Sequence, residues 1–277
     1  MTKFRIKTKY YSIWVVSFLV CALSATPYFE ATVVNFSNRP EGVELLAKTC
    51  TKKVLDCEAN TSSSKTILLI GDSHAGHLLN LVFKYGKHYD YNVYTYTNNP
   101  CSVQIISAES SCKLVNKKVK NWIILNKPEV IIVSQYITEK WNLDTTKDSL
   151  NFMQNNSKRV LLIGNNPIFP PTSVFGYWPN ISLLQILINL SRGNDPVMFQ
   201  QSIPITKMDT SGELNNDSLL YWAKTKGILV LDPWSLFCDA MYCHRKIGNN
   251  WLYFDYNHLS KYGADLYYSS LEQIFAT

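Results

Sequence analysis

The body of this 277-residue sequence lacks an excess of basic residues, although its formal net charge is +6. Four basic residues, Lys3, Arg5, Lys7 and Lys9, lie within the first ten positions, where no acidic residue occurs. Without them, 23 basic residues stand against 21 acidic ones, a net charge of +2. Nucleic-acid binding needs basic residues clustered on the folded domain. The sequence therefore argues against a nucleic-acid partner.

Charge is absent altogether between Lys9 and Glu30, where the sequence reads YYSIWVVSFLVCALSATPYF. A membrane-spanning helix needs about 20 such residues. Basic residues before a span stay in the cytoplasm, so the chain beyond the span lies outside. We expect residues 1–34 to be a basic segment and a retained membrane anchor. The small residues Ala22 and Ser24 leave a cleaved signal peptide open as the alternative.

No odd cysteine remains outside that apolar segment. The six cysteines after Cys21 form three pairs that are close in sequence, and an even number suits an oxidising compartment. Because neighbours in sequence close the smallest loops, we expect three local disulfides worth about 2–3 kcal/mol each: Cys50 with Cys57, Cys101 with Cys112, and Cys238 with Cys243. Cys238, Cys243 and His244 also permit zinc, but no second ligand pair has finger spacing, and we expect no metal and no cofactor.

Internal repeats are absent too, and the remaining chain divides into a polar linker, residues 35–64, and one domain, residues 65–277. Five apolar strand candidates alternate with helical patterns such as Lys113–Leu125 and Leu214–Lys226. This alternation predicts an α/β domain of three layers with a mainly parallel sheet. The strand candidates lie at 67–70, 92–97, 129–134, 159–164 and 228–232.

The most informative stretch, KTILLIGDSHAGHLLNL, runs from Lys65 to Leu81. Its apolar run predicts a buried parallel strand, Gly71 permits a turn, and helical spacing comes next. Ser73 is therefore expected at the carboxyl end of a strand, where α/β sheets bind ligands. The N–H groups of the following helix would point back at the serine and stabilise an oxyanion there.

A nucleophilic serine needs a histidine base, and the base needs a carboxylate that holds its tautomer. His258 lies in a loop between the last strand and a final helix, so it is expected at the same sheet edge as Ser73. Asp255 precedes His258 by three residues, close enough to meet the imidazole within one turn. His74 and His77 come soon after Ser73, and we assign both to packing.

The interval between the fourth and fifth strands holds an aromatic stretch, NNPIFPPTSVFGYWPN. Tyr177 and Trp178 in it are candidates for a platform that stacks on sugar rings. The stronger interpretation is that most of these aromatic residues pack beneath the long loop as a small separate core.

GDSH at Gly71–His74 and DYNHLS at Asp255–Ser260 together resemble the SGNH (GDSL-like) hydrolase superfamily. The resemblance narrows with NPCS at Asn99–Ser102, the Cys238 and Cys243 pair, and YFDxxHLSxxGA ending at Ala264. These motifs resemble the extracytoplasmic SGNH domain fused to membrane acyltransferase-3 proteins, which O-acetylate surface polysaccharides.

The resemblance implies an α/β/α sandwich of the SGNH/flavodoxin-like type with a five-stranded sheet. It implies that Ser73 is the nucleophile, His258 the general base and Asp255 the residue that orients it. The expected reaction is acetyl transfer to hydroxyls of a surface polysaccharide such as lipopolysaccharide, through an acyl-serine. Since the chain has at most one membrane segment, we expect either that a separate membrane acyltransferase supplies the acetyl group or that the chain is a shortened relative of the fused proteins. The expected location is the bacterial inner membrane, with the catalytic domain in the periplasm.

One departure from the superfamily concerns the oxyanion hole. Its hydrolases carry Gly-x-Asn-Asp after the third strand, whereas Ser134-Gln135-Tyr136-Ile137 stands here. The Ser73 backbone N–H is the donor we expect, with Asn99 and Gln135 as further candidates.

Three alternatives compete with this interpretation. A carbohydrate O-acetylesterase would use the same triad with water as acceptor, and sequence does not separate it from a transferase. A non-catalytic glycan-binding domain with this fold would not need both Ser73 and His258. An α/β-hydrolase elbow, Gly-x-Ser-x-Gly, is broken by Ala75.

Overall fold

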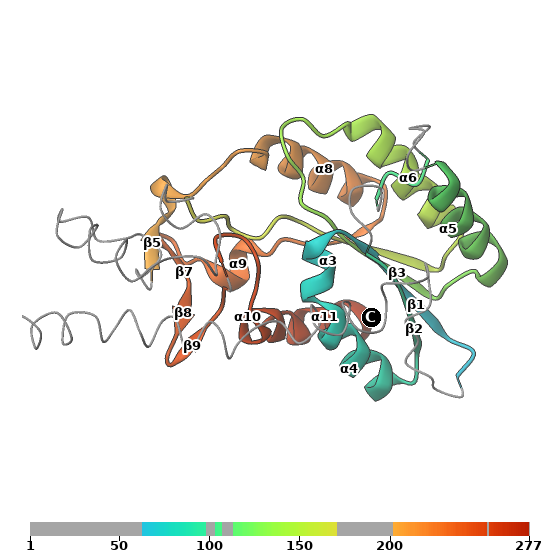
Figure 1. Ribbon diagram of the computed structural model, residues 1–277, viewed down its shortest axis with the longest axis horizontal. Helices are drawn as coiled ribbons and strands as arrows, with labels where there is room; N and C mark the ends of the chain where they lie inside the picture. Colours follow the sequence, from blue (N-terminus) through green and yellow to red (C-terminus); the bar gives the residue numbers. More distant parts are fainter. Residues whose placement is uncertain (1–62, 98–102, 107–112, 171–201, 254, 277) are drawn as a thin grey trace, which may run out of the picture. The chain divides into compact units, whose positions relative to one another are not determined.

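The computed structural model describes residues 63–97, 103–106, 113–170, 202–253 and 255–276, all within one unit of the chain, Asn38–Thr277 (Figure 1). The expected anchor, most of the linker and the first two cysteine pairs lie outside these residues, so they remain predictions. Within the described part, no helix is both long and apolar enough to cross a membrane.

A five-stranded parallel sheet forms the centre of the domain, in the order β2-β1-β3-β4-β6. Every strand candidate from the sequence is present, so the predicted α/β fold with a five-stranded sheet is confirmed. The strands are β1 (Thr66–Gly71), β2 (Asn92–Tyr96), β3 (Val130–Ser134), β4 (Arg159–Ile163) and β6 (Leu229–Leu231).

Helices cover both faces of this sheet (Figure 1). Because side chains of a strand point alternately to opposite faces, Ile67 and Leu69 of β1 enter one core, and Leu68 and Ile70 enter the other. The first core takes side chains from α4 and α11, and the second from α5, α6 and α8. The helices are α3 (Ser73–His77), α4 (Leu79–Tyr89), α5 (Lys113–Asn126), α6 (Leu143–Asn155), η2 (Ile205–Lys207), α8 (Glu213–Thr225), α9 (Trp234–Phe237), α10 (Lys261–Asp265) and α11 (Tyr267–Ala276).

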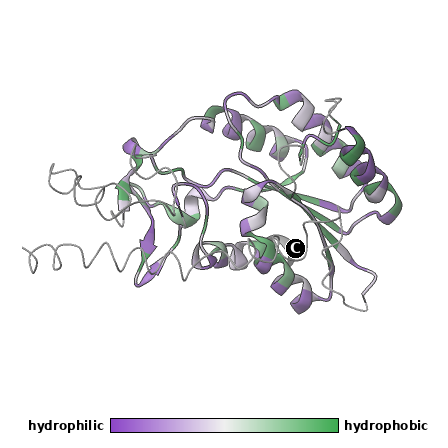
Figure 2. Cartoon of the chain, in the orientation of Figure 1, coloured by the Kyte–Doolittle hydropathy of each residue, from purple (hydrophilic) through white to green (hydrophobic). Residues whose placement is uncertain are grey.

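Hydropathy matches this layering. The strands of the central sheet are largely hydrophobic, whereas the helices carry both hydrophobic and hydrophilic residues (Figure 2). Helices of this kind bury one side against the sheet and leave the other side to solvent.

Two helices expected to be continuous are interrupted. The helix after Ser73 divides at Leu78, whose N–H donates to the carbonyl of Ala75 at 3.0 Å and so tightens the turn. The final helix likewise divides at Leu266, between α10 and α11. The short first segment, α3, is therefore free to continue the turn at Ser73 while α4 packs on the sheet.

Two small antiparallel pairs were not predicted from the sequence. β5 (Ser202–Pro204) pairs with β7 (Tyr242–His244), and β8 (Lys246–Ile247) pairs with β9 (Asn250–Trp251). Strands of two or three residues are too short to show an alternating pattern. Three of the four strands lie in the segment that leads to Asp255 and His258.

Candidate active site

The turn that carries Ser73 depends on a glycine. Gly71 pairs with Ser134 on β3, and a Cβ at position 71 would lie 1.7 Å from the Ser134 carbonyl oxygen and 2.5 Å from the Ala75 Cβ. No larger residue fits between two backbone segments this close. Gly71 thus lets β1 end against β3 and turn at once into α3, with Ser73 as its first, exposed residue.

Asp72 fixes this turn through its carboxylate. One oxygen, Oδ1, caps α3 by accepting a hydrogen bond from the backbone N–H of His74 at 2.8 Å. The other, Oδ2, accepts from Gln135 Nε2 at 2.8 Å and from the Tyr136 backbone N–H at 3.2 Å. The buried Asp72 side chain therefore joins the Ser73 turn to the loop after β3.

Ser73, His258 and Asp255 form one hydrogen-bonded chain. His258 Nε2 lies 3.0 Å from Ser73 Oγ, and His258 Nδ1 lies 2.6 Å from Asp255 Oδ2. An ionised carboxylate accepts only, so Nδ1 carries the proton and Nε2 is left to accept from the serine hydroxyl. This is the arrangement that a general base for Ser73 requires.

The backbone of its own loop holds Asp255 in place. Asp255 Oδ1 accepts hydrogen bonds from the backbone N–H groups of Asn257 at 2.9 Å and His258 at 2.7 Å. Burial raises the pKa of Asp255, but the hydrogen bond and charge of His258 and these two N–H groups outweigh burial and leave the pKa below its ordinary value. Asp255 is therefore ionised at neutral pH.

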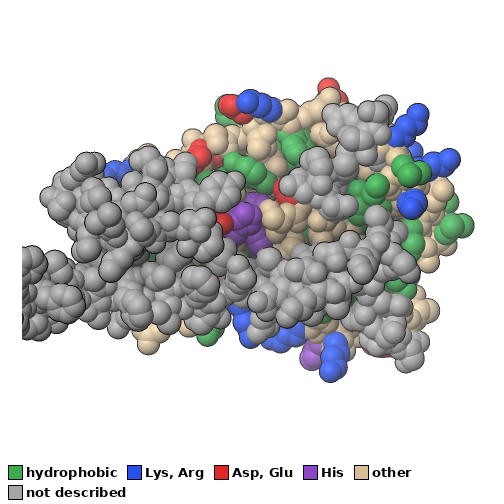
Figure 3. Space-filling model, viewed as in Figure 1, with side chains coloured by type: hydrophobic (Ala, Val, Ile, Leu, Met, Phe, Trp, Pro, Cys, Tyr) green, Lys and Arg blue, Asp and Glu red, His purple; other side chains and the backbone are tan. Residues whose placement is uncertain are grey.

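His74 and His77, which the sequence analysis assigned to packing, are buried behind His258. The His77 ring meets the His258 ring edge-on, with centroids 4.9 Å apart, and the His74 ring stacks on Tyr136 at 5.3 Å. Burial lowers the pKa of His74 to about 4, against an opposing pull from Asp72, and burial lowers the pKa of His77 well below its usual range. Both rings are therefore uncharged at neutral pH and pack beside His258. In Figure 3 histidine side chains gather near the middle of the face in view, beside acidic atoms.

The remaining site predictions have mixed outcomes. Gln135 is buried and donates from Nε2 to the carboxylate of Asp72, the residue before Ser73. Its part in an oxyanion hole stays a prediction. Asn165, just after β4, binds both backbone groups of Ile137 at 2.8 Å and so fixes the loop after β3. Asn99, Tyr177 and Trp178 lie outside the described residues.

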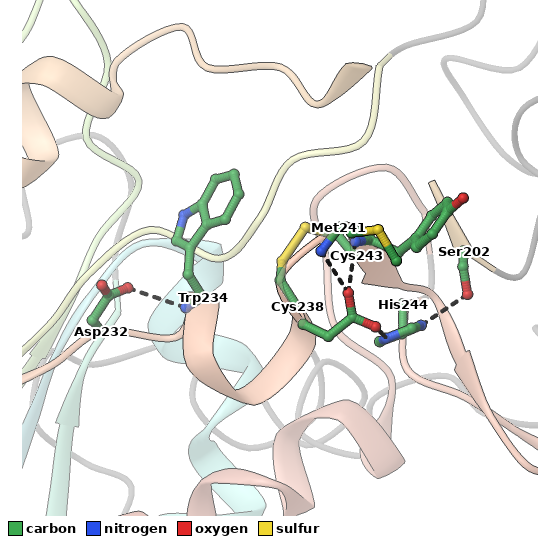
Figure 4. Close-up of a disulfide and its surroundings, with 9 residues drawn as sticks. Ser202, Asp232, Trp234, Cys238, Met241, Cys243 and His244 are labelled. Carbon is green, nitrogen blue, oxygen red and sulfur yellow. Dashed lines mark hydrogen bonds and ion pairs between the residues drawn. A yellow bond between two sulfur atoms is a disulfide. The ribbon is translucent and has the colours of Figure 1, made fainter. Parts of the chain in front are cut away.

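The Cys238–Cys243 disulfide is present as predicted (Figure 4). It leaves no thiolate for the zinc alternative, and His244 is engaged elsewhere. Its Nδ1 lies 2.8 Å from Ser202 Oγ, and its Nε2 lies 3.0 Å from Asp239 Oδ2. Within the described residues, no three potential ligands gather into a metal site.

Sequence reasoning missed two residues of the site. Asp72 appeared there only as part of GDSH, without a role, and Arg245 was not singled out. Arg245 is buried, and its Nη2 donates to the Asp255 carbonyl oxygen at 3.2 Å. In the sequence, Arg245 is distinguished only by its position two residues after Cys243.

The chain is similar to known proteins in family and in fold. The family model described as "SGNH domain (fused to AT3 domains)" matches residues 44–273. The structure is similar to the periplasmic domain of the lipopolysaccharide acetyltransferase of Salmonella ser. Paratyphi A, with a TM-score of 0.57 and 17% identity over 78% of this chain and 85% of that one. A GDSL-like lipase from Bacteroides thetaiotaomicron matches with a TM-score of 0.44 and 12% identity, over 85% of this chain and 97% of that one. No protein of curated function matches the chain in sequence.

Proposed function

The chain belongs to the family of SGNH domains that are fused to AT3 domains, and on this premise we propose that it transfers acetyl groups to hydroxyls of a surface polysaccharide, with Ser73 as nucleophile. The fold is that of SGNH acyltransferases and hydrolases. The observation that carries the proposal is the continuous hydrogen-bonded chain from Asp255 through His258 to Ser73.

In the proposed first step, Ser73 Oγ attacks the carbonyl carbon of the acetyl donor while His258 Nε2 takes the hydroxyl proton. Asp255, which is ionised, stabilises the imidazolium that forms. The tetrahedral intermediate then collapses, the bond to the leaving group breaks, and the leaving group receives the proton from His258. The product is an acetyl ester on Ser73.

The negative oxygen of the tetrahedral intermediate needs hydrogen-bond donors. The Ser73 backbone N–H is our first candidate, because Asp72 holds the turn at the start of α3 through three hydrogen bonds. Gln135, which donates from Nε2 to Asp72, and Asn99 remain the further candidates.

In the second step, a sugar hydroxyl gives its proton to His258 Nε2 and attacks the acetyl carbonyl carbon. Ser73 then leaves and recovers the proton. Water in place of the sugar would make the same site an O-acetylesterase. The exposure of Ser73 is compatible with either acceptor. The fold likeness to a lipopolysaccharide acetyltransferase domain supports transfer as the first candidate.

We further propose that a separate membrane acyltransferase supplies the acetyl group and that the domain works in the periplasm. The support is the description of the family, whose domains are fused to AT3 domains, and the periplasmic origin of the similar Salmonella domain. An exchange of acetyl groups between two proteins requires an accessible nucleophile, which Ser73 is.

The test compares Ser73→Ala with Ser202→Ala in the full chain. Ser202 is a matched control because it too bonds a histidine, His244, but outside the proposed site. We expect the native chain and Ser202→Ala to gain an acetyl group from p-nitrophenyl acetate and to acetylate the surface polysaccharide in cells, and Ser73→Ala to do neither. Unchanged polysaccharide acetylation in Ser73→Ala cells would overturn the proposal. Loss of acetyl from the polysaccharide when the native chain is produced would identify the esterase instead.

A further inference from the structure

Arg245 is a cation buried beside the candidate site. It comes directly after β7 and precedes β8, and only 2% of its surface is exposed. Arginine is almost never fully buried unless it is paired, because removing a charge from water is costly. Its position therefore calls for a specific partner.

The contacts of Arg245 lead to the loop that carries the proposed triad. Its Nη2 donates a hydrogen bond to the backbone carbonyl of Asp255 at 3.2 Å. The guanidinium lies 5.1 Å from the ring centre of Phe169 and 6.0 Å from that of Trp251. Arg245 Nε has no hydrogen-bond partner in the described part of the chain. The hydrogen bond from Nη2 to the Asp255 carbonyl is therefore important for holding the side chain in place.

The backbone of Arg245 is also tied to this loop. The Arg245 carbonyl accepts a hydrogen bond from the Leu252 N–H at 2.7 Å, and the Leu252 carbonyl accepts from the Ser260 N–H at 2.9 Å. The second bond closes the base of the loop, and Tyr253 bridges to Leu259 just inside it. Arg245 thus holds the loop at its base through the backbone and at Asp255 through its side chain.

Electrostatics favours the same pairing. Burial lowers the pKa of Arg245 to about 10, and the nearby Asp255 carboxylate opposes that shift. Arg245 stays charged at neutral pH, and its charge attracts the carboxylate that binds His258.

We propose that Arg245 is a positioning residue for the reaction: its hydrogen bond to the Asp255 carbonyl sets the place of the Asp255 carboxylate and, through it, the orientation of His258 toward Ser73. The inference rests on the proposed function. Asp255 has its carbonyl held by Arg245 and its carboxylate held by two loop N–H groups and by His258. Release of the carbonyl lets the whole residue shift, and a shift of about 1 Å in a reacting group can cost roughly 100-fold in rate.

A purely structural role predicts a different result. Arg245→Met removes one partner of a buried pairing and leaves the Asp255 carbonyl without its donor, which destabilises the fold, although methionine would fill the space between Phe169 and Trp251 as a flexible side chain. For Arg245→Met we therefore expect a lower melting temperature together with slower acylation by each folded molecule. A residue that served stability alone would also lower the melting temperature but would leave the rate per folded molecule unchanged, so the rate is what separates the two roles.

Lys246→Met is the matched control. Lys246 is the next residue, is also a cation, and lies 5.4 Å from the same Trp251 ring, but no described contact joins it to Asp255. The full-length native chain and both variants would be compared by the rate of p-nitrophenolate release from p-nitrophenyl acetate per folded molecule. We expect Arg245→Met to lower kcat roughly 10- to 100-fold with little change in KM, and Lys246→Met to match the native chain.

Proton NMR gives a readout that does not depend on activity. A proton held between His258 Nδ1 and Asp255 resonates far downfield, and His258→Gln identifies the signal. We expect this signal in the native chain and in Lys246→Met, and its shift or loss in Arg245→Met. Arg245→Lys, which keeps the charge and one donor, should restore part of both readouts, and it serves as the test if Arg245→Met does not fold.

A native rate and a native NMR signal in folded Arg245→Met would overturn the inference. If the native chain itself failed to acylate Ser73, the proposed function would fail, whereas the NMR comparison would still test whether Arg245 positions Asp255.

Discussion

His77 lies edge-on to His258, with ring centroids 4.9 Å apart and planes at 83° to each other. The Leu259 N–H points at His77 Nδ1, 3.4 Å away, so His77 keeps its proton on Nε2. In the proposed reaction His258 becomes positively charged, and the His77 ring packed against it stays neutral. Had His77 been charged, it would have opposed protonation of His258.

The first prediction comes from the low pKa of His74. The unfolded chain binds a proton at this histidine below a pKa of about 6.5, whereas the folded chain does so only below about 4. Between these values the unfolded state holds more protons, so stability falls as pH is lowered. Through His74 the native chain should therefore lose about 2 kcal/mol of stability between pH 7 and pH 5. His74→Phe, which keeps an aromatic ring against Tyr136, should not show this loss.

Urea denaturation at a series of pH values measures this slope. His88→Phe is the control, since His88 is an exposed histidine on α4. A pH slope that is the same in His74→Phe as in the native chain would show that His74 is not held neutral by burial.

The second prediction concerns the tautomer of His258. In Asp255→Asn the amide nitrogen can donate to His258 Nδ1, which moves the ring proton to Nε2 and removes the acceptor for Ser73. We expect acylation by p-nitrophenyl acetate to slow roughly 10³- to 10⁴-fold, as loss of an orienting aspartate does in serine hydrolases. Asp239→Asn, which alters the carboxylate that bonds His244, should keep the native rate. Equal rates for the two variants would contradict the role given to Asp255.

The third prediction concerns the Cys238–Cys243 disulfide, which joins the end of α9 to β7. Its loop is short, so the double variant Cys238→Ser with Cys243→Ser should lose about 2 kcal/mol of stability, measured by urea denaturation. Because Arg245 comes directly after β7, acylation should slow as well. The variant is preferable to a reductant, which would also reach any bond between the other cysteines. An unchanged urea midpoint would argue against a stabilising role.

The fourth prediction tests the close approach at Gly71. In Gly71→Ala the new methyl group meets the Ser134 carbonyl at 1.7 Å, and neither backbone segment can move without opening the sheet. We expect a loss of about 3 kcal/mol or more. Gly248→Ala is the comparison: its φ is +58° but open space surrounds the new methyl group, so it should cost only about 1 kcal/mol. Similar losses in chemical denaturation would show that backbone conformation, rather than the contact with Ser134, limits position 71.

The sequence was enough to predict the central sheet and the proximity of Ser73 to His258. Continuous apolar runs identify buried parallel strands, and residues placed just after such strands meet at one edge whatever their distance in the chain. Arg245 could not be found in this way. It lies between strands of two or three residues, where no periodic pattern exists, and its partner is a backbone carbonyl, which leaves no mark on the sequence.

The breaks at Leu78 and Leu266 show a second limit. Both lie within patterns that favour one continuous helix, and a single tightened turn, decided by tertiary packing, divides each helix. Asp72 is an intermediate case. Its cap on α3 reflects a general preference, whereas its bonds to Gln135 and Tyr136 require knowledge that β1 and β3 are neighbours.

The hydrogen bond between Ser73 and His258 joins residues 185 positions apart. A ribosome completes the serine turn long before it reaches the histidine, so a growing chain carries the nucleophile without its base for most of synthesis. An unfinished or prematurely stopped chain would therefore hold an inert serine. Acyl chemistry would begin only once nearly the whole domain has been made and folded, in whichever compartment that happens.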